Sequence, residues 1–194
     1  MADALAILEL SGVATGYYVL DKMLKHSPVE IIEANLIEPG VYLILYTGGV
    51  AEVQEAHQAV IQSRKDGIRA ELILPFAHPS ILSGLKGAEL KYSAEQYDCL
   101  GVIETNSVSS SLMGADQAIK NTDVSLVGIR IAGGLGGKAY YVMCGSQHDV
   151  EVALDISQAE VEKVGGIHRR ELIPRPHQDM IEWLLRPAPF SIKR

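Results

Sequence analysis

Two short loops contain the groups in this chain that are best suited to chemistry. The first loop presents one carboxylate, Glu38, within the run Ile37, Glu38, Pro39 and Gly40. Carboxylate oxygens are ligands that hard cations such as calcium prefer. The second loop, residues 132–138, has four glycines around one leucine: Gly133, Gly134, Leu135, Gly136 and Gly137. Because glycine permits positive φ and close approach of the backbone, this loop is the second candidate for a binding site.

The glycine loop does not match two common nucleotide-binding patterns. A Walker-type phosphate loop needs a glycine six residues before its lysine and a serine or threonine directly after it. Relative to Lys138, these positions hold Ala132 and Ala139. The dinucleotide pattern fails as well, because its third glycine position, counted from Gly134, is again Ala139. Two interpretations stay open: the tight or mobile rim of a pore, or a simple turn.

Other nucleophilic and metal-binding side chains are few. The two cysteines, Cys99 and Cys144, lie in strand-like segments, which favours buried small hydrophobic residues over ligands. His57 and His148 lie on or next to predicted helices, and we expect them to face solvent. No serine–histidine–aspartate pattern indicates a nucleophile. The sequence therefore predicts a protein that is not an enzyme and binds no cofactor.

Composition excludes several classes of function. The chain has 194 residues, of which 47% are hydrophobic and 21% charged, as in ordinary soluble globular proteins. A formal net charge of -7 argues against a nucleic-acid partner. No apolar run approaches the roughly 20 residues of a membrane span, and the first residues lack the basic start of a signal peptide. We expect a cytoplasmic protein with no membrane partner.

The chain contains an internal duplication. Leu5–Glu9 matches Leu100–Glu104 at an offset of 95 residues, and the offset becomes 97 where Gly40 meets Gly137. The repeat closes where Pro75–His78 meets Pro174–His177. So long a period indicates duplicated domains rather than a solenoid. We expect a first domain at residues 4–82, a linker at 83–98, a second domain at 99–182 and a C-terminal extension at 183–194.

Each copy is predicted to fold as βαββαβ, an α+β layer of sheet and helices. Strands are expected at 5–10, 29–37, 41–46 and 70–74 in the first copy, and at 99–105, 124–132, 139–144 and 171–173 in the second. Helices are expected at 11–25, 50–65, 107–120 and 149–164, with one more helical turn at 180–185. The two candidate loops therefore join the second and third strands of their copies.

A set of motifs connects this pattern to a known family. The second copy has Leu100-Gly101-Val102-Ile103-Glu104-Thr105 at a strand start, Asp116 to Lys120 at a helix end, the glycine loop, and the closing run Ile173-Pro174-Arg175-Pro176-His177. The first copy keeps Glu9, Asp21, Lys25 and the Pro75…His78 pair. With these features the chain resembles the bacterial microcompartment shell family. Two copies that each open with the glutamate-bearing strand resemble its tandem-domain, non-permuted members in propanediol-utilisation compartments.

The resemblance implies a homotrimer of ferredoxin-like tandem chains that mimics a hexamer and tiles a compartment shell with other shell proteins. A central pore for small metabolites would be lined by the two loops: Ile37, Glu38, Pro39, Gly40, Gly133, Gly134, Leu135 and Gly136. Tile-to-tile contacts would come from Lys25, Lys120, Arg175 and His177. Lysine and arginine suit a lattice edge, because each donates several hydrogen bonds. The first copy has Phe76 where the second has Arg175, so no matching contact is expected from Phe76.

Tandem shell proteins of this type carry a cysteine in the first-copy loop, and three of these hold an iron–sulfur cluster on the axis. A cluster needs thiolates, and this chain has Glu38 at that place, so no cluster is predicted. Our hypothesis is a ring of three Glu38 carboxylates that favours cations and resists anions. Such a ring would also be a candidate site for a hard cation. The alternative is that Glu38 simply points into solvent.

Three functions follow from these patterns. The leading one is a pore-bearing shell tile. The second is a tile that binds a metal or redox centre on its axis and conducts electrons. The third is a regulatory protein whose duplicated domains bind a small ligand between the copies. Iron analysis separates the first two, and a stable monomer or dimer with a saturable ligand would favour the third.

Overall fold

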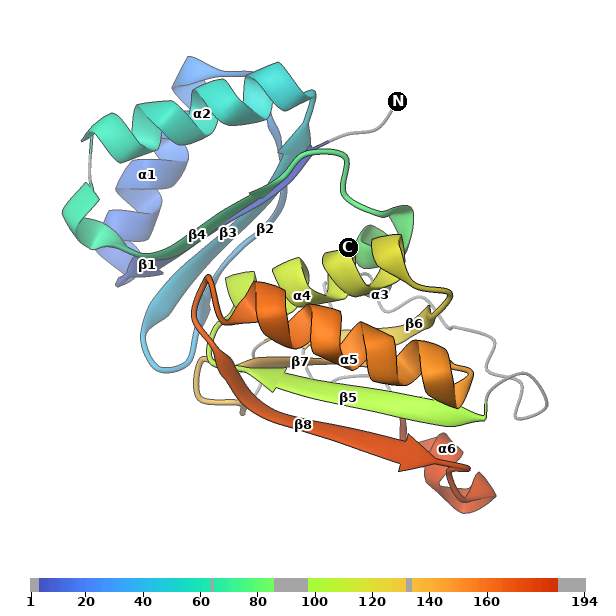
Figure 1. Ribbon diagram of the computed structural model, residues 1–194. Helices are drawn as coiled ribbons and strands as arrows, with labels where there is room; N and C mark the ends of the chain where they lie inside the picture. Colours follow the sequence, from blue (N-terminus) through green and yellow to red (C-terminus); the bar gives the residue numbers. More distant parts are fainter. Residues whose placement is uncertain (1–3, 64, 86–97, 132–133, 185–194) are drawn as a thin grey trace. The chain divides into compact units, whose positions relative to one another are not determined.

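The computed structural model describes residues 4–63, 65–85, 98–131 and 134–184 (Figure 1). Its contacts divide the chain into two compact units, Met1–Ala77 and His78–Arg194. Each unit is a four-stranded antiparallel sheet with two long helices on one face. Within the described residues, every helix is too short or too polar to cross a membrane.

The first unit contains one complete copy of the repeat. Its elements are β1 (Ala4–Ser11), α1 (Val13–His26), β2 (Glu30–Ile37), β3 (Val41–Gly48), α2 (Val50–Ser63), a short 3-10 turn at Lys65–Gly67, and β4 (Ile68–Leu74). The strand order is β2-β3-β1-β4. Alternate residues of β1 and β3 pack against Val19 and Met23 of α1 and Val53 of α2. This face of the sheet and the inner faces of the two helices form the core of the unit.

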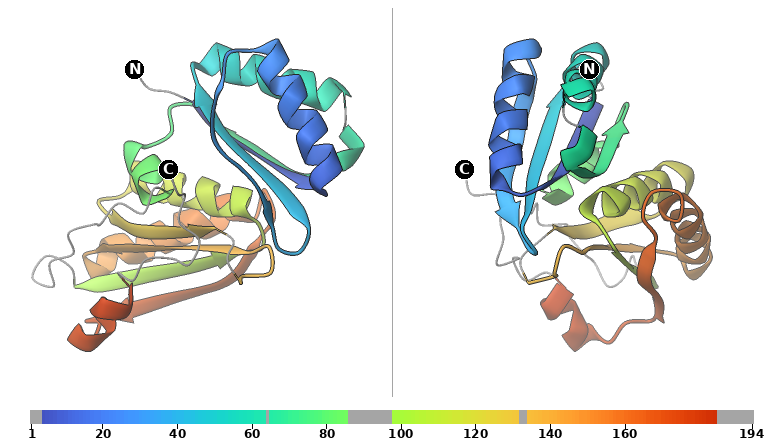
Figure 2. Two further views of the ribbon diagram at one scale, coloured as in Figure 1. Left: turned by 180° about the vertical axis from the view of Figure 1, so that it is seen from behind. Right: turned by 90° about the vertical axis from the view of Figure 1, so that its left-hand side faces the viewer.

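The second unit repeats this architecture and carries two further short helices. Its elements are α3 (Pro79–Leu85), β5 (Cys99–Thr105), α4 (Val108–Asn121), β6 (Ser125–Ile131), β7 (Ala139–Gly145), α5 (Gln147–Val161), β8 (Ile167–Pro174) and α6 (Gln178–Leu184). The strand order is β6-β7-β5-β8. Helices α4 and α5 cover one face, and α6 lies on the opposite face (Figure 2), where Met180 and Leu184 pack against a cluster of Leu100, Val127, Val142 and Cys144.

Local sequence signals explain where the helices of the second unit begin. Ser107 caps α4, because its hydroxyl accepts a hydrogen bond from the backbone N–H of Ser110 at 3.1 Å. Ser146 caps α5 in the same way, through the N–H of Asp149 at 3.1 Å. Both caps satisfy backbone donors that have no partner within the first helical turn.

The strand register confirms the duplication at single-residue level. The β2–β3 ladder shifts between Ile31 and Glu33, and the β6–β7 ladder shifts between Leu126 and Gly128. The bulged residues, Ile32 and Val127, lie 95 positions apart, which is the offset of the repeat. A second pair of shifts follows Glu9 in β1 and Glu104 in β5. A bulge re-aims the strand, so both copies bend at the same two places.

The predicted βαββαβ order of both copies is confirmed, with two differences. Strand β8 begins at Ile167, several residues before its predicted start, because it pairs along the whole of β5. Helix α3 was not predicted. Although it follows the last strand of the first copy, α3 belongs to the second unit, where Ile81 and Leu85 are buried.

Candidate functional site

The first candidate loop is a tight hairpin between β2 and β3. Ile37 pairs with Val41, which leaves Glu38, Pro39 and Gly40 as the connection. The Glu38–Pro39 peptide is cis, and Gly40 has a φ of 79°, a left-handed conformation that suits glycine. The three connecting residues are exposed, whereas Ile37 is buried. The hairpin therefore holds the Glu38 carboxylate at the exposed tip of two paired strands.

The second candidate loop occupies the equivalent place between β6 and β7. Gly134, Gly136 and Gly137 have φ values of 86°, 61° and 84°, and the N–H of Lys138 donates to the carbonyl of Leu135 at 3.2 Å. Non-glycine residues rarely adopt such φ values, so the glycines are required by the backbone path. Gly133, also predicted to line a pore, lies outside the described residues.

A side-chain contact ties the second loop to the last strand of its sheet. Nζ of Lys138 lies 3.0 Å from Nε2 of His168, which is in β8. An ammonium group has only donors, so His168 accepts this hydrogen bond through a deprotonated nitrogen. The glycine loop thus ends in a positive charge, whereas the first loop presents a carboxylate.

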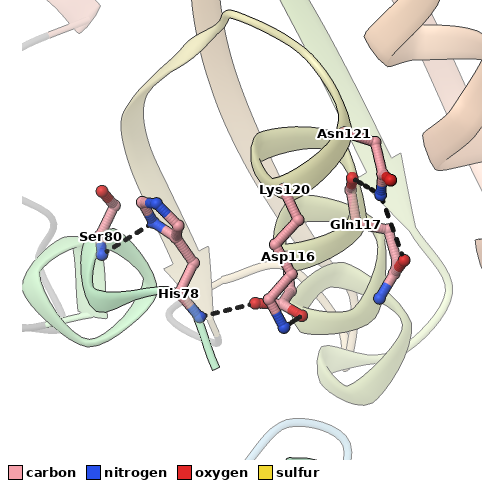
Figure 3. Close-up of polar contacts among 6 residues, drawn as sticks. All are labelled: His78, Ser80, Asp116, Gln117, Lys120 and Asn121. Atoms are coloured by element: carbon pink, nitrogen blue, oxygen red, sulfur yellow. Dashed lines mark hydrogen bonds and ion pairs between the residues drawn. The ribbon is translucent and has the colours of Figure 1, made fainter. Parts of the chain in front are cut away.

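Two of the predicted edge residues form the same ion pair in the two copies. Lys25 lies 2.7 Å from Asp21 on α1, and Lys120 lies 2.6 Å from Asp116 on α4. Their surroundings differ. The Asp116 side chain is 0% exposed and also accepts a hydrogen bond from the N–H of His78 at 2.8 Å (Figure 3), whereas the Asp21 side chain is 60% exposed.

The other two predicted edge residues, Arg175 and His177, lie in the closing turn after β8. Arg175 has a φ of 47°, close to the 58° of its counterpart Phe76. Nδ1 of His177 accepts the N–H of the residue two positions later at 3.3 Å, as does Nδ1 of His78. Both histidines therefore close the same local turn at the start of a short helix, and Arg175 and His177 are exposed.

The residues present do not fit an iron–sulfur cluster at either loop. Cys99 pairs with Gly145 and Cys144 with Leu100, at the end of the β5–β7 ladder that is remote from the glycine loop. Both thiols are buried, as predicted for small hydrophobic residues. Glu38 supplies no thiolate in the first loop. Within the described parts of the chain, no cluster of three or more acidic, histidine or cysteine side chains is placed to hold a metal ion.

A buried polar group in the first unit was not predicted. The expectation that His57 faces solvent is wrong: the residue is 8% exposed, and its Nδ1 lies 2.7 Å from the Tyr46 hydroxyl. Its Nε2 lies 3.3 Å from a carboxylate oxygen of Glu71. Burial lowers the pKa of His57, and Glu71 opposes part of that effect. The sequence did contain a signal for this contact. Tyr46 and His57 are both polar, whereas their counterparts in the second copy, Met143 and Leu154, are both apolar.

Comparison with known proteins identifies the class. The BMC domain family matches residues 4–76 and 99–176, once in each unit. The chain therefore belongs to the BMC domain family and is a bacterial microcompartment shell protein of the tandem type.

The relatives agree with this assignment. The shell protein PduT of Citrobacter freundii is 34% identical over 180 residues, which cover 93% of this chain and 96% of PduT. The shell protein PduA of the same organism matches 85 residues at 32% identity, or 44% of this chain and 89% of PduA. A crystal structure of a microcompartments protein from Desulfitobacterium hafniense superposes with a TM-score of 0.82 and 31% identity, covering 94% of this chain and 99% of that one.

Proposed function

We propose that this protein is a trimeric, pseudohexameric tile of a compartment shell, with a central pore through which small metabolites pass. The observation that carries the proposal is the pair of equivalent hairpin loops, one in each copy, at the ends of strand ladders whose registers shift at equivalent positions. In a trimer, six such loops would surround one axis. The similarity to PduT over nearly the whole of both chains supports this architecture.

Glu38 would set the charge of the pore. Its exposed position at the hairpin tip would bring three carboxylates together around a three-fold axis. A ring of carboxylates attracts cations and opposes the entry of anions. The second loop would contribute a rim of glycines, whose missing side chains leave room between neighbouring chains.

The outer edge of the tile would contact other shell proteins. Lys25, Lys120, Arg175 and His177 are the predicted edge residues, and the exposed Arg175 fits that role best. An arginine fork can donate to two or more carbonyl oxygens of a neighbouring tile. The compartment shell is accordingly the proposed location of the protein.

The first test is the native mass of the purified protein, with visible absorbance and iron content measured on the same sample. We expect a colourless trimer of about three times the 21.0 kDa chain. A stable monomer with a saturable ligand would instead support the regulatory alternative. A brown, iron-containing trimer would mean that a cluster forms without a loop cysteine, and would contradict the assignment of Glu38.

Sheet formation tests the edge separately. Arg175→Gln is expected to leave the trimer intact while abolishing extended sheets seen by electron microscopy. Arg69→Gln is the matched control, since Arg69 is an exposed arginine on β4 outside the closing turn. Equal sheet formation by both variants would remove Arg175 from the proposed edge.

A further inference from the structure

The two copies differ in how well their second strand is covered. In β6, Leu126 is 2% exposed and Ile129 is 3% exposed. Their counterparts in β2 are Ile31 and Ala34, which are only partly buried, and the next residue on that face, Leu36, is 50% exposed. The first copy therefore leaves an apolar strip open that the second copy covers.

Helix α3 covers this strip in the second unit. A methyl group added to Gly84 would lie 2.9 Å from Cδ2 of Leu126 and 3.6 Å from Cγ1 of Ile129. The backbone of α3 thus packs directly on two residues of β6. The turn that begins α3 lies on α4, because the N–H of His78 donates to Asp116.

The same turn accounts for the burial of the Asp116–Lys120 pair. With the turn in place, the Asp116 and Lys120 side chains are 0% and 30% exposed. The Asp21 and Lys25 side chains, at the equivalent positions of α1, are 60% and 73% exposed. Asp21 therefore has the geometry of Asp116, but within the described segments it receives no backbone donor like the His78 N–H that Asp116 accepts.

The chain contains a second segment of the α3 type. His177–Leu184 follows the second copy as His78–Leu85 follows the first, with the same histidine turn at its start. Met180 and Leu184, the counterparts of Ile81 and Leu85, pack on the sheet of their own unit. Trp183, the counterpart of Gly84, is 64% exposed. The face of α6 that corresponds to the β6-contacting face of α3 thus presents a tryptophan.

The sizes of the facing residues are complementary. In the contact within the second unit, Gly84 of α3 faces two large residues of β6, Leu126 and Ile129. In the open strip of β2, one of the two corresponding residues, Ala34, is small and the other, Ile31, is large, while the corresponding helix residue is Trp183. The larger helix residue therefore coincides with a smaller strand residue at one of the two facing positions, which leaves part of the room that it needs.

We propose that segment His177–Leu184 of one chain docks on α1 and β2 of a second copy of this chain. Trp183 packs on Ile31 and Ala34 of the second copy, and the N–H of His177 donates to its Asp21. The contact is heterologous, so its repetition generates a closed ring when the rotation permits. The inference rests on the proposed trimer and assigns the residues that join its chains.

The test makes the side chain at position 183 small and the side chain at position 34 large. Sedimentation then measures the concentration at which the trimer dissociates. Trp183→Ala removes the anchor, and Ala34→Ile fills its place, so each single variant is expected to weaken association at least tenfold, a typical loss for a central tryptophan. The double variant Trp183→Ala with Ala34→Ile reproduces the small-on-large packing of Gly84 on Ile129 and is expected to regain most of the lost affinity.

Asp21→Asn tests the polar part of the contact, and Asp155→Asn is its control, since Asp155 is an exposed acid that forms a 2.7 Å ion pair with Arg170. Only Asp21→Asn should lower the stability of the trimer. All the substituted positions are at least partly exposed, so each variant is expected to fold. Circular dichroism is the control that checks this.

The outcomes separate this inference from the proposed function. A wild-type trimer whose dissociation is unchanged in Trp183→Ala and Ala34→Ile overturns the docking and leaves the trimeric tile standing. Additive losses in the double variant, without recovery, also overturn it, because Trp183 and Ala34 would then not face each other. A wild-type chain that stays monomeric overturns the trimer and the docking together.

Discussion

The Tyr46 hydroxyl lies 2.7 Å from Nδ1 of His57 within the core of the first copy, and this buried contact has no counterpart in the second copy. The second copy has Met143 and Leu154 at the two positions. The duplicated domains thus share a backbone but differ in the chemistry of one core contact. The first copy should consequently respond to pH in a way that the second does not.

We predict that acid destabilises the first copy through His57. Burial disfavours the charged imidazolium and lowers the pKa of His57 in the folded chain below the value of about 6.5 expected when unfolded. The unfolded chain then binds more protons between the two pKa values, so the free energy of unfolding falls as pH decreases below about 6.5. Thermal melts from pH 7.5 to pH 5 check this.

The second copy supplies the control for this prediction. His57→Leu alone should cost about 1–3 kcal/mol, because it leaves the buried Tyr46 hydroxyl without its partner. Adding Tyr46→Met removes that hydroxyl and should recover much of the loss. A double variant that keeps the full pH dependence of the wild type above pH 5 would show that another group titrates.

Glu38→Gln is predicted to change ion passage without changing the fold. The side chain lies at an exposed hairpin tip, so the free energy of unfolding should change by less than about 0.5 kcal/mol. If three carboxylates line a pore, their removal should reduce the preference for cations, and Glu38→Lys should reverse it. Reversal potentials across a salt gradient measure both variants. Glu162→Gln, on an exposed position at the end of α5, should have no effect.

Gly136→Ala is predicted to destabilise the second copy by about 1–2 kcal/mol, the cost of placing an L-residue in the left-handed region. An added methyl group would meet no atom within 4 Å, so the effect isolates the φ of 61°. Gly136→Asn should cost less, because asparagine tolerates this conformation. Urea denaturation compares them with Gly128→Ala, where the space is also open and φ is not left-handed. Equal losses at both positions would contradict the backbone explanation.

Asp116→Ala is predicted to cost about 2–3 kcal/mol, because it leaves the Lys120 ammonium and the His78 N–H without their shared acceptor. Asp155→Ala removes an exposed ion pair of similar length and should cost less than about 1 kcal/mol. Both are measured as free energies of unfolding in urea. Similar costs would show that the burial of Asp116 adds nothing to its contribution.

Periodicity and duplication alone determined most of the backbone. Residue patterns predicted the strands of each copy, and the repeat between Glu9 and Glu104 related the two sets. The almost wholly apolar run Val41–Tyr46 was predicted to be a buried strand, and it lies in β3, an inner strand of its sheet. The glycines of the second loop were recognisable as a backbone requirement, and their left-handed φ values agree. Such local signals are readable because each depends on residues near one another in the chain.

Only the tertiary structure decided which side chains are buried together. The place of His57 in its predicted helix could not show that its ring contacts the Tyr46 hydroxyl, because this contact depends on how α2 packs on β3. Nor could sequence place α3 with the second unit, because Gly84 gains its contacts from Leu126 and Ile129, more than forty residues away. The same distance dependence separates Asp116 from Asp21. Both form an ion pair with a lysine four residues later, but a turn 38 residues away in the sequence buries Asp116, whereas the Asp21 side chain is 60% exposed.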